Sequence, residues 1–164
     1  MSNSALRVLA GAGAIDDPVY VDDVFSTFVY EGNSSSRTIT NGIDLDGEGG
    51  LVWIKWRAGL NGVGHLLYTK ALGTGNYLAS NTASALNTGN TTQLSAFNSN
   101  GFSLGGSTEV NYNGDDYVSW TFRKQPGFFD VVTYTGNGSA RTISHNLGSV
   151  PGMIIVKRTD SSAD

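Results

Sequence analysis

The sequence has no cysteine, which excludes a disulfide framework, a thiolate nucleophile and any metal site built on cysteine. Charge is also scarce, since 15% of the 164 residues are charged and the formal net charge is -4. Without a basic run, nucleic acid is not expected as a partner. The longest apolar stretches are far shorter than the ~20 residues that span a bilayer, so membrane insertion is not expected either.

Turn-forming residues are abundant, with 22 glycines and many serines, threonines and asparagines. No window shows a sustained helical period, whereas short alternating runs between Gly and Asn turns recur along the chain. This pattern predicts an all-β fold, an antiparallel β-sandwich of jelly-roll or lectin-like type. Strands are expected over 24–30, 37–40, 51–57, 65–69, 76–80, 93–98, 102–104, 109–112, 116–123, 129–134 and 153–157.

The three tryptophans lie in two of these expected strands. In 116–123, Trp120 alternates with polar residues together with Val118 and Phe122, which predicts that all three point into the core. Trp53 and Trp56 cannot face the same way on one strand. One of them is therefore expected on the outer face, where it could contact a glycan or another subunit.

An internal repeat organises the chain. The residues Tyr-x-Gly-Asn-x-Ser-x-Arg-Thr-Ile at 30–39 reappear at 134–143, with seven identities in ten positions and an offset of 104. A second block, 50–55, matches 152–157 at an offset of 102. The two copies are unequal, because equivalents of about 63–124 are absent from the second. We therefore expect either that the natural chain continues or that another chain completes the second copy.

This repeat predicts four parts. Residues 1–23 form an N-terminal docking arm, 24–124 the first sandwich, 125–127 a linker at Pro126 and Gly127, and 128–164 the first strands of a second, incomplete sandwich. The arm is too short to bury its own apolar groups, so we expect it to dock on a partner. Its candidate docking residues are Leu6, Val8, Leu9, Ile15 and Val19.

The sequence contains only incomplete motifs for metal binding or catalysis. Asp44, Asp46 and Glu48 resemble part of a calcium loop but lack the remaining ligands, and the adjacent pair at 115–116 indicates a hairpin tip. His65 and His145 stand in no metal-binding or nucleophile motif. Neither catalytic residues nor a metal or cofactor are therefore expected, and the chain is not expected to be an enzyme.

Longer strings carry a resemblance to a known family. They are YVDDVFSTFVYEGN, NGIDLDGEGGLVWIKWR, FNSNGFSLG and YVSWTFRKQPGFFDVVTYTGNGSARTISHNLGSVPGMIIVKR. Over about 20–164 the chain resembles the repeated domain of tail-fibre and related virion structural proteins of marine tailed phages, including cyanophages and pelagiphages. In such proteins, segments of the last type join one domain to the next.

The resemblance implies a multi-domain fibre, normally a homotrimer, held at its N-terminus by other tail, baseplate or nozzle proteins of the virion. Such a protein is made in the host cytoplasm, works in the virion tail, and meets a host surface glycan or protein only indirectly. The resemblance carries no catalytic residue. Three alternatives stay open: a carbohydrate-binding sandwich, a capsid-surface or head fibre, and a polysaccharide-degrading spike.

Overall fold

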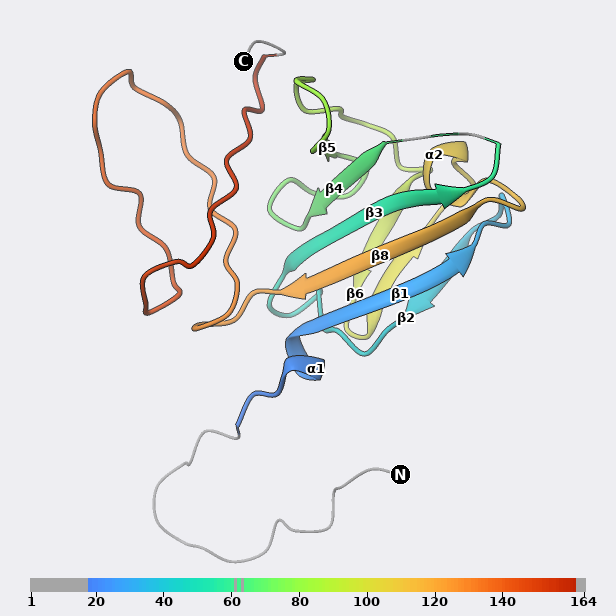
Figure 1. The fold of residues 1–164 in the computed structure, drawn as a ribbon, viewed down its shortest axis with the longest axis horizontal. Helices are drawn as coiled ribbons and strands as arrows, with labels where there is room; N and C mark the ends of the chain where they lie inside the picture. The colour runs from blue at the N-terminus through green and yellow to red at the C-terminus, as the bar shows by residue number, and fades with distance from the viewer. Residues whose placement is uncertain (1–17, 61, 63, 162–164) are drawn as a thin grey trace, which may run out of the picture.

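The computed structural model describes residues 18–60, 62 and 64–161 and is mostly β, with two four-residue helices, α1 (Val21–Val24) and α2 (Thr108–Asn111) (Figure 1). The strands are β1 (Phe25–Glu31), β2 (Arg37–Thr40), β3 (Gly50–Ala58), β4 (His65–Thr69), β5 (Leu78–Ala79), β6 (Leu94–Asn98), β7 (Gly101–Leu104) and β8 (Asp116–Arg123). Within this described part, neither helix has the length or apolar character needed to cross a membrane.

The strands form two antiparallel sheets, an arrangement consistent with a β-sandwich. The five-stranded sheet has the order β1-β8-β3-β4-β5, and the three-stranded sheet has the order β2-β7-β6. The first strands of the fold thus pair with its last ones, because β1 pairs with β8 and β2 pairs with β7. In Figure 1 the larger sheet faces the viewer and the smaller sheet lies behind it.

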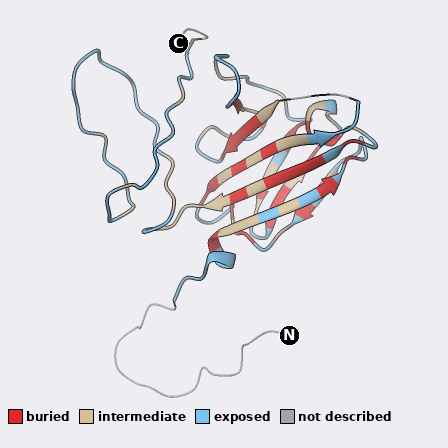
Figure 2. Ribbon diagram, viewed as in Figure 1, coloured by how far each residue is buried: buried red, intermediate tan, exposed pale blue. Residues whose placement is uncertain are grey.

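The core lies between the two sheets. Val52 and Ile54 of β3 and Tyr68 of β4 contribute from the larger sheet, and Ile39 of β2 and Phe102 of β7 from the smaller one. All five are almost completely buried. Buried residues alternate along β3, as Figure 2 shows, because successive side chains of a strand point to opposite faces.

Most expected strands of the first copy form, and 37–40 and 65–69 have the expected bounds. The strand expected over 76–80 shrinks to β5. The strand expected over 109–112 is wrong, because this region forms helix α2. Ser107 caps that helix, since its hydroxyl accepts a hydrogen bond from Glu109 N at 3.3 Å.

The second copy behaves differently from the first. Residues 130–161 contain no named strand, so the strands expected over 129–134 and 153–157 are not formed. No residue from 126 to 161 is buried, and Figure 2 shows this segment in the colours of exposed and intermediate residues. The interpretation of 128–164 as the start of a second sandwich therefore stays a prediction.

The linker between the copies is an ordered turn. Gln125 N donates to Phe129 O at 2.9 Å, and Phe128 N donates to Gln125 O at 3.1 Å. Gly127 takes a φ of 77°, which a residue with a side chain rarely adopts. The ring of Phe129 then packs on Phe122 of β8 with centroids 5.2 Å apart. The junction is thus fixed by hydrogen bonds and ring packing.

Candidate functional site

The outer face of the five-stranded sheet carries an apolar surface at its centre. Cross-strand pairing places Trp53 of β3 opposite Trp120 of β8 on one side and opposite Leu67 of β4 on the other. The two indole rings meet edge to face with centroids 5.5 Å apart. We call this surface the outer aromatic face. Its members are Phe25, Val29, Leu51, Trp53, Leu67, Val118, Trp120 and Phe122.

The orientation of β8 corrects an expectation. Val118, Trp120 and Phe122 were expected to point into the core, but all three lie on the outer face, where Val118 is buried and the other two are half-buried. The inward positions belong to Tyr117, Ser119 and Thr121, which are almost fully buried. One of them, Thr121, accepts a hydrogen bond from Asn41 Nδ2 at 2.8 Å. The sequence missed this orientation because apolar residues occupy both registers of the strand.

The other two tryptophans face opposite ways, as expected. Trp53 lies on the outer face, on the same side of β3 as Lys55. Trp56 packs against the core, and its Nε1 donates to the buried carboxylate of Asp115 at 3.0 Å. Of the two candidates for a glycan or subunit contact, only Trp53 is therefore placed to meet a partner across the outer face.

His65 borders the same surface. Its ring lies 5.8 Å from that of Trp53, at the start of β4. Burial, and then the positive charge of Lys55, lowers the pKa of His65. The shift favours the uncharged imidazole, which borders the outer aromatic face on this side.

The N-terminal arm lies largely outside the described residues. Leu6, Val8, Leu9 and Ile15 are not among them, so their expected docking role stays a prediction. Val19 is described and is 50% exposed. Tyr20 and Val21, which the sequence analysis did not single out, follow it and are also exposed. An apolar patch therefore stands at the point where the arm joins β1.

The acidic motifs have structural partners. The Asp44 carboxylate accepts hydrogen bonds from the backbone of Asp46 and Gly47, at 3.0 and 2.9 Å, and so closes a turn. Asp46 in turn pairs with Lys70 at 3.0 Å. Residues 18–60, 62 and 64–161 contain no cluster of three or more His, Asp or Glu side chains that could hold a metal ion.

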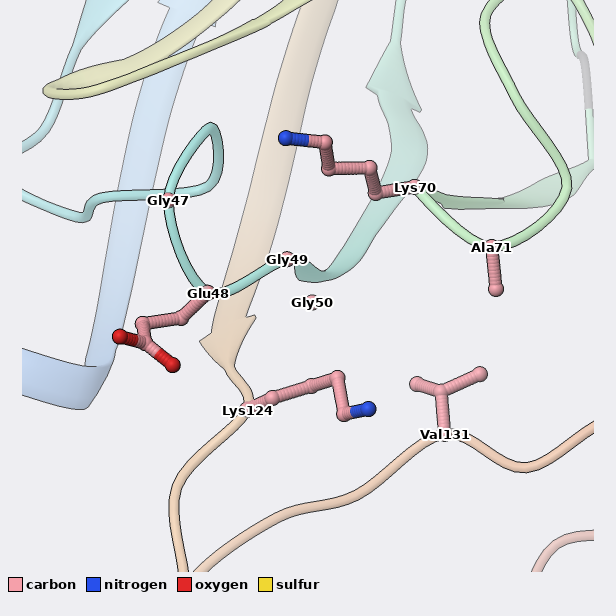
Figure 3. Close-up of a pocket in the computed structure, with 8 residues that line it drawn as sticks. All are labelled: Gly47, Glu48, Gly49, Gly50, Lys70, Ala71, Lys124 and Val131. Carbon is pink, nitrogen blue, oxygen red and sulfur yellow. The ribbon is translucent and has the colours of Figure 1, made fainter.

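Two open cavities lie at the junction of the copies. The first, of about 210 Å³, is lined by Gly47, Glu48, Gly49, Gly50, Lys70, Ala71, Lys124 and Val131. In Figure 3 the Lys124 side chain extends toward Val131, whereas the Glu48 carboxylate points away from Val131. The second, of about 220 Å³, shares Glu48 and Lys124 with the first. Both cavities thus belong to the contact between the sandwich and the second copy.

Asp130 ties the second copy to the sandwich. Its side chain is only 5% exposed and pairs with Lys124 at 3.0 Å. It also accepts hydrogen bonds from Val131 N and Asn146 N, each at 2.8 Å. Burial by itself would raise the pKa of Asp130, but these bonds and the Lys124 charge outweigh it, and the pKa falls below its usual value.

We therefore expect the junction to open in acid. Because the pKa of Asp130 is lowered in the folded chain, its stabilising contribution is fully present above about pH 4 and is lost as the pH falls through the lowered value. The amide NMR signals of Val131 and Asn146 should shift together, with a midpoint below about pH 3.9. Asp130→Asn should remove this shared transition; its persistence in the variant would contradict the assignment.

The second copy reproduces one local structure of the first. In the first copy Ser35 N donates to Asn33 Oδ1 at 3.0 Å, and Arg37 lies 5.2 Å from the Tyr30 ring. In the second, the matching hydrogen bond between residues 139 and 137 is 3.1 Å long, and the matching cation–ring distance, from residue 141 to residue 134, is 5.8 Å. The repeat found in the sequence is therefore also a repeat of loop conformation.

The comparison with known families covers both copies. A family model described as "Domain of unknown function (DUF7483)" matches residues 21–164. The chain belongs to this DUF7483 family. No curated protein and no solved structure matches the chain. The DUF7483 match begins at Val21, the first residue of α1, so the apolar patch at 19–21 lies at the edge of the family domain.

Proposed function

We propose that this DUF7483 chain is a structural protein of a phage virion, the proximal part of a trimeric tail fibre. It attaches to the tail through its N-terminal arm and supports host recognition. In this proposal it performs no catalysis and needs no cofactor. The resemblance of residues 20–164 to fibre repeats supports the virion assignment, and the outer aromatic face supports association between subunits.

The outer aromatic face is the observation that carries the proposal. An antiparallel sheet that faces water usually carries polar residues on that side. Here β8, which lies between β1 and β3, places Trp120 and Phe122 outward and the small polar residues Ser119 and Thr121 inward. Val29 of this face is exposed and the aromatic rings of the face are half-buried, and contiguous apolar surface that water can reach marks an interaction site. A second and third copy of the same sheet would cover it.

The second copy keeps this apolar character. Leu51 and Trp53 on the outer face correspond to Met153 and Ile155 at the repeat offset, and a lysine follows in each copy, Lys55 and Lys157. The side chains differ, but each position stays apolar. In a fibre whose chains run side by side, every repeat needs a face of this kind, because each meets the same repeat of its neighbours.

The strand order supports a finer description of the fold. We infer a jelly-roll type of sandwich, because the chain folds back so that β1 meets β8 and β2 meets β7. Rigid modules of this type, joined by ordered turns like 125–129, build an extended rod. At its start, the exposed Val19, Tyr20 and Val21 continue the arm that would dock on a baseplate or nozzle protein.

Carbohydrate binding is the second candidate function, and the Trp53–Trp120 pair is the observation that favours it, because sugar rings stack on exposed aromatic rings. A head fibre would share the chemistry of the first proposal and differ only in where the arm docks.

Native mass spectrometry of the natural polypeptide tests the fibre proposal. We expect a trimer that Trp53→Lys dissociates, because the new charge would be buried in the subunit contact. Thr40→Lys, on the exposed side of β2, is the matched control and should leave the trimer intact. A monomeric wild-type protein would refute the trimer, and glycan binding abolished by Trp53→Lys would then favour the second candidate.

The virion location is tested on purified phage particles. Peptides of this chain should be found in the particles, and removal of residues 1–20 should abolish incorporation while the sandwich stays folded, because α1 and β1 are retained. Incorporation of the truncated chain at the normal level would contradict docking through the arm.

A further inference from the structure

The second copy exposes the apolar side chains that its counterpart buries. Four positions that point inward on β1 and β3 have apolar equivalents in 128–161. The pairs are Phe28 and Val132, Tyr30 and Tyr134, Val52 and Ile154, and Ile54 and Val156. Ile154 is 73% exposed where its counterpart Val52 is fully buried. The segment thus carries one half of a core without the other half.

The topology of the first copy explains why the second has no strands. Strands β1, β2 and β3 do not pair with one another: β1 pairs with β8, β2 with β7, and β3 with β8 and β4. The second copy contains equivalents of β1, β2 and β3 alone. None of the three can form a ladder until strands of the β7 and β8 type lie beside them.

We infer that residues 128–161 are one half of a domain and form their strands when they bind a polypeptide segment of the β4–β8 type. A strand like β8 would enter between 129–135 and 152–160, and a strand like β7 would pair with 141–144. This follows from the strand order of the first copy and does not depend on the trimer or on the virion.

The first copy also defines what the segment must carry. A tyrosine equivalent to Tyr117 would stack on Tyr134, as Tyr117 stacks on Tyr30 with centroids 5.2 Å apart. An asparagine equivalent to Asn111 would bind the turn at 137–139, as Asn111 binds the backbone of Asn33 and Ser35. That turn already has the bound conformation, which lowers the ordering cost of binding.

The described residues hold two sets of β1–β3 type, at 25–58 and 129–160, and one set of β4–β8 type, which already completes the first copy. Residues 63–124, which contain that set, therefore serve as the probe for the occupant.

The experiment appends a second copy of residues 63–124 directly after Asp164, in register with the offset of 102. Hydrogen exchange measured by mass spectrometry should show protection of 129–135, 141–144 and 152–160 at least about 100-fold above that in the original chain. As a matched control, Ser119→Pro in the appended copy alone should abolish this protection, because proline removes a ladder donor from the strand that must pair on both sides.

A third variant distinguishes native completion from unspecific collapse. Gly136→Ala should reduce the new protection in the extended chain, because its counterpart Gly32 touches the Tyr112 backbone in the first copy. Two outcomes would overturn the inference. One is that 129–160 exchanges as fast in the extended chain as in the original; the other is that the Ser119→Pro control is equally protected.

Discussion

Replacing Gly32 with alanine should destabilise the sandwich by about 3 kcal/mol, near the upper end of what overpacking usually costs. A Cβ at this position would lie 2.1 Å from the backbone oxygen of Tyr112. The chain cannot move away easily, because Gly32 N donates to Asp115 O and Gly32 O accepts from Gly114 N. Thermal unfolding followed by circular dichroism should show a Tm lower by ~15 °C.

Gly136→Ala is the matched control, because Gly136 is the repeat equivalent of Gly32 and a Cβ there would meet nothing within 4 Å. Its effect should stay within about 0.5 kcal/mol. Equal effects of the two substitutions would show that the close contact at Gly32 does not set the difference. The pair thus measures what tertiary contact adds to two nearly identical loops.

Replacing Asn111 with aspartate should cost about 3 to 5 kcal/mol, the range found when a buried polar partner is lost and a charge is left unpaired. Asn111 is fully buried, and its Nδ2 donates to Ser35 O at 2.7 Å, to Gly105 O at 2.9 Å and to Asn33 Oδ1 at 3.0 Å. Aspartate would set a carboxylate oxygen against these three oxygens. Chemical denaturation at pH 7 should reveal the loss.

The same variant has a signature in acid. A carboxyl group buried among oxygens has a raised pKa in the folded state, so its cost grows as the pH rises above the unfolded value of about 3.9. The deficit of Asn111→Asp relative to the wild type should therefore shrink at pH 3. Asn113→Asp, two residues away and exposed, is the control and should change stability by less than about 0.5 kcal/mol. A deficit independent of pH would contradict this account.

Alternation and turn residues predicted the strands of the first copy well. The ranges 37–40, 65–69 and 116–123 were right. Turn-forming residues precede each of them, namely Ser36, Gly64 and the Asn113-Gly114 pair, and Asn41 also ends the first. The strand predicted over 109–112 was wrong because Ser107 caps a helix there, through a hydrogen bond with Glu109, two residues away. Errors of this kind are local and concern short elements.

The face of β8 could not be predicted in the same way. Tyr117 in one register and Trp120 in the other are both large enough for a core. Which side of β8 faces inward depends on the partners available there. One such partner is Asn41, whose Nδ2 donates to Thr121 Oγ1 at 2.8 Å. For this reason the outer aromatic face, which carries the proposed subunit contact, is visible in the structure but could not be predicted from the alternation of apolar residues in the sequence.

The sequence by itself determined the all-β class, the repeat and the conformation of the repeated loop, because these rest on interactions between residues close in the chain. The loops at 33–37 and 137–141 fold alike although only one of them is packed. The tertiary structure alone decided which side of β8 is buried, which groups Asn111 binds, and whether 129–160 forms strands. Those outcomes depend on pairing between segments as distant as β1 and β8, and no local pattern records which partner a strand will find.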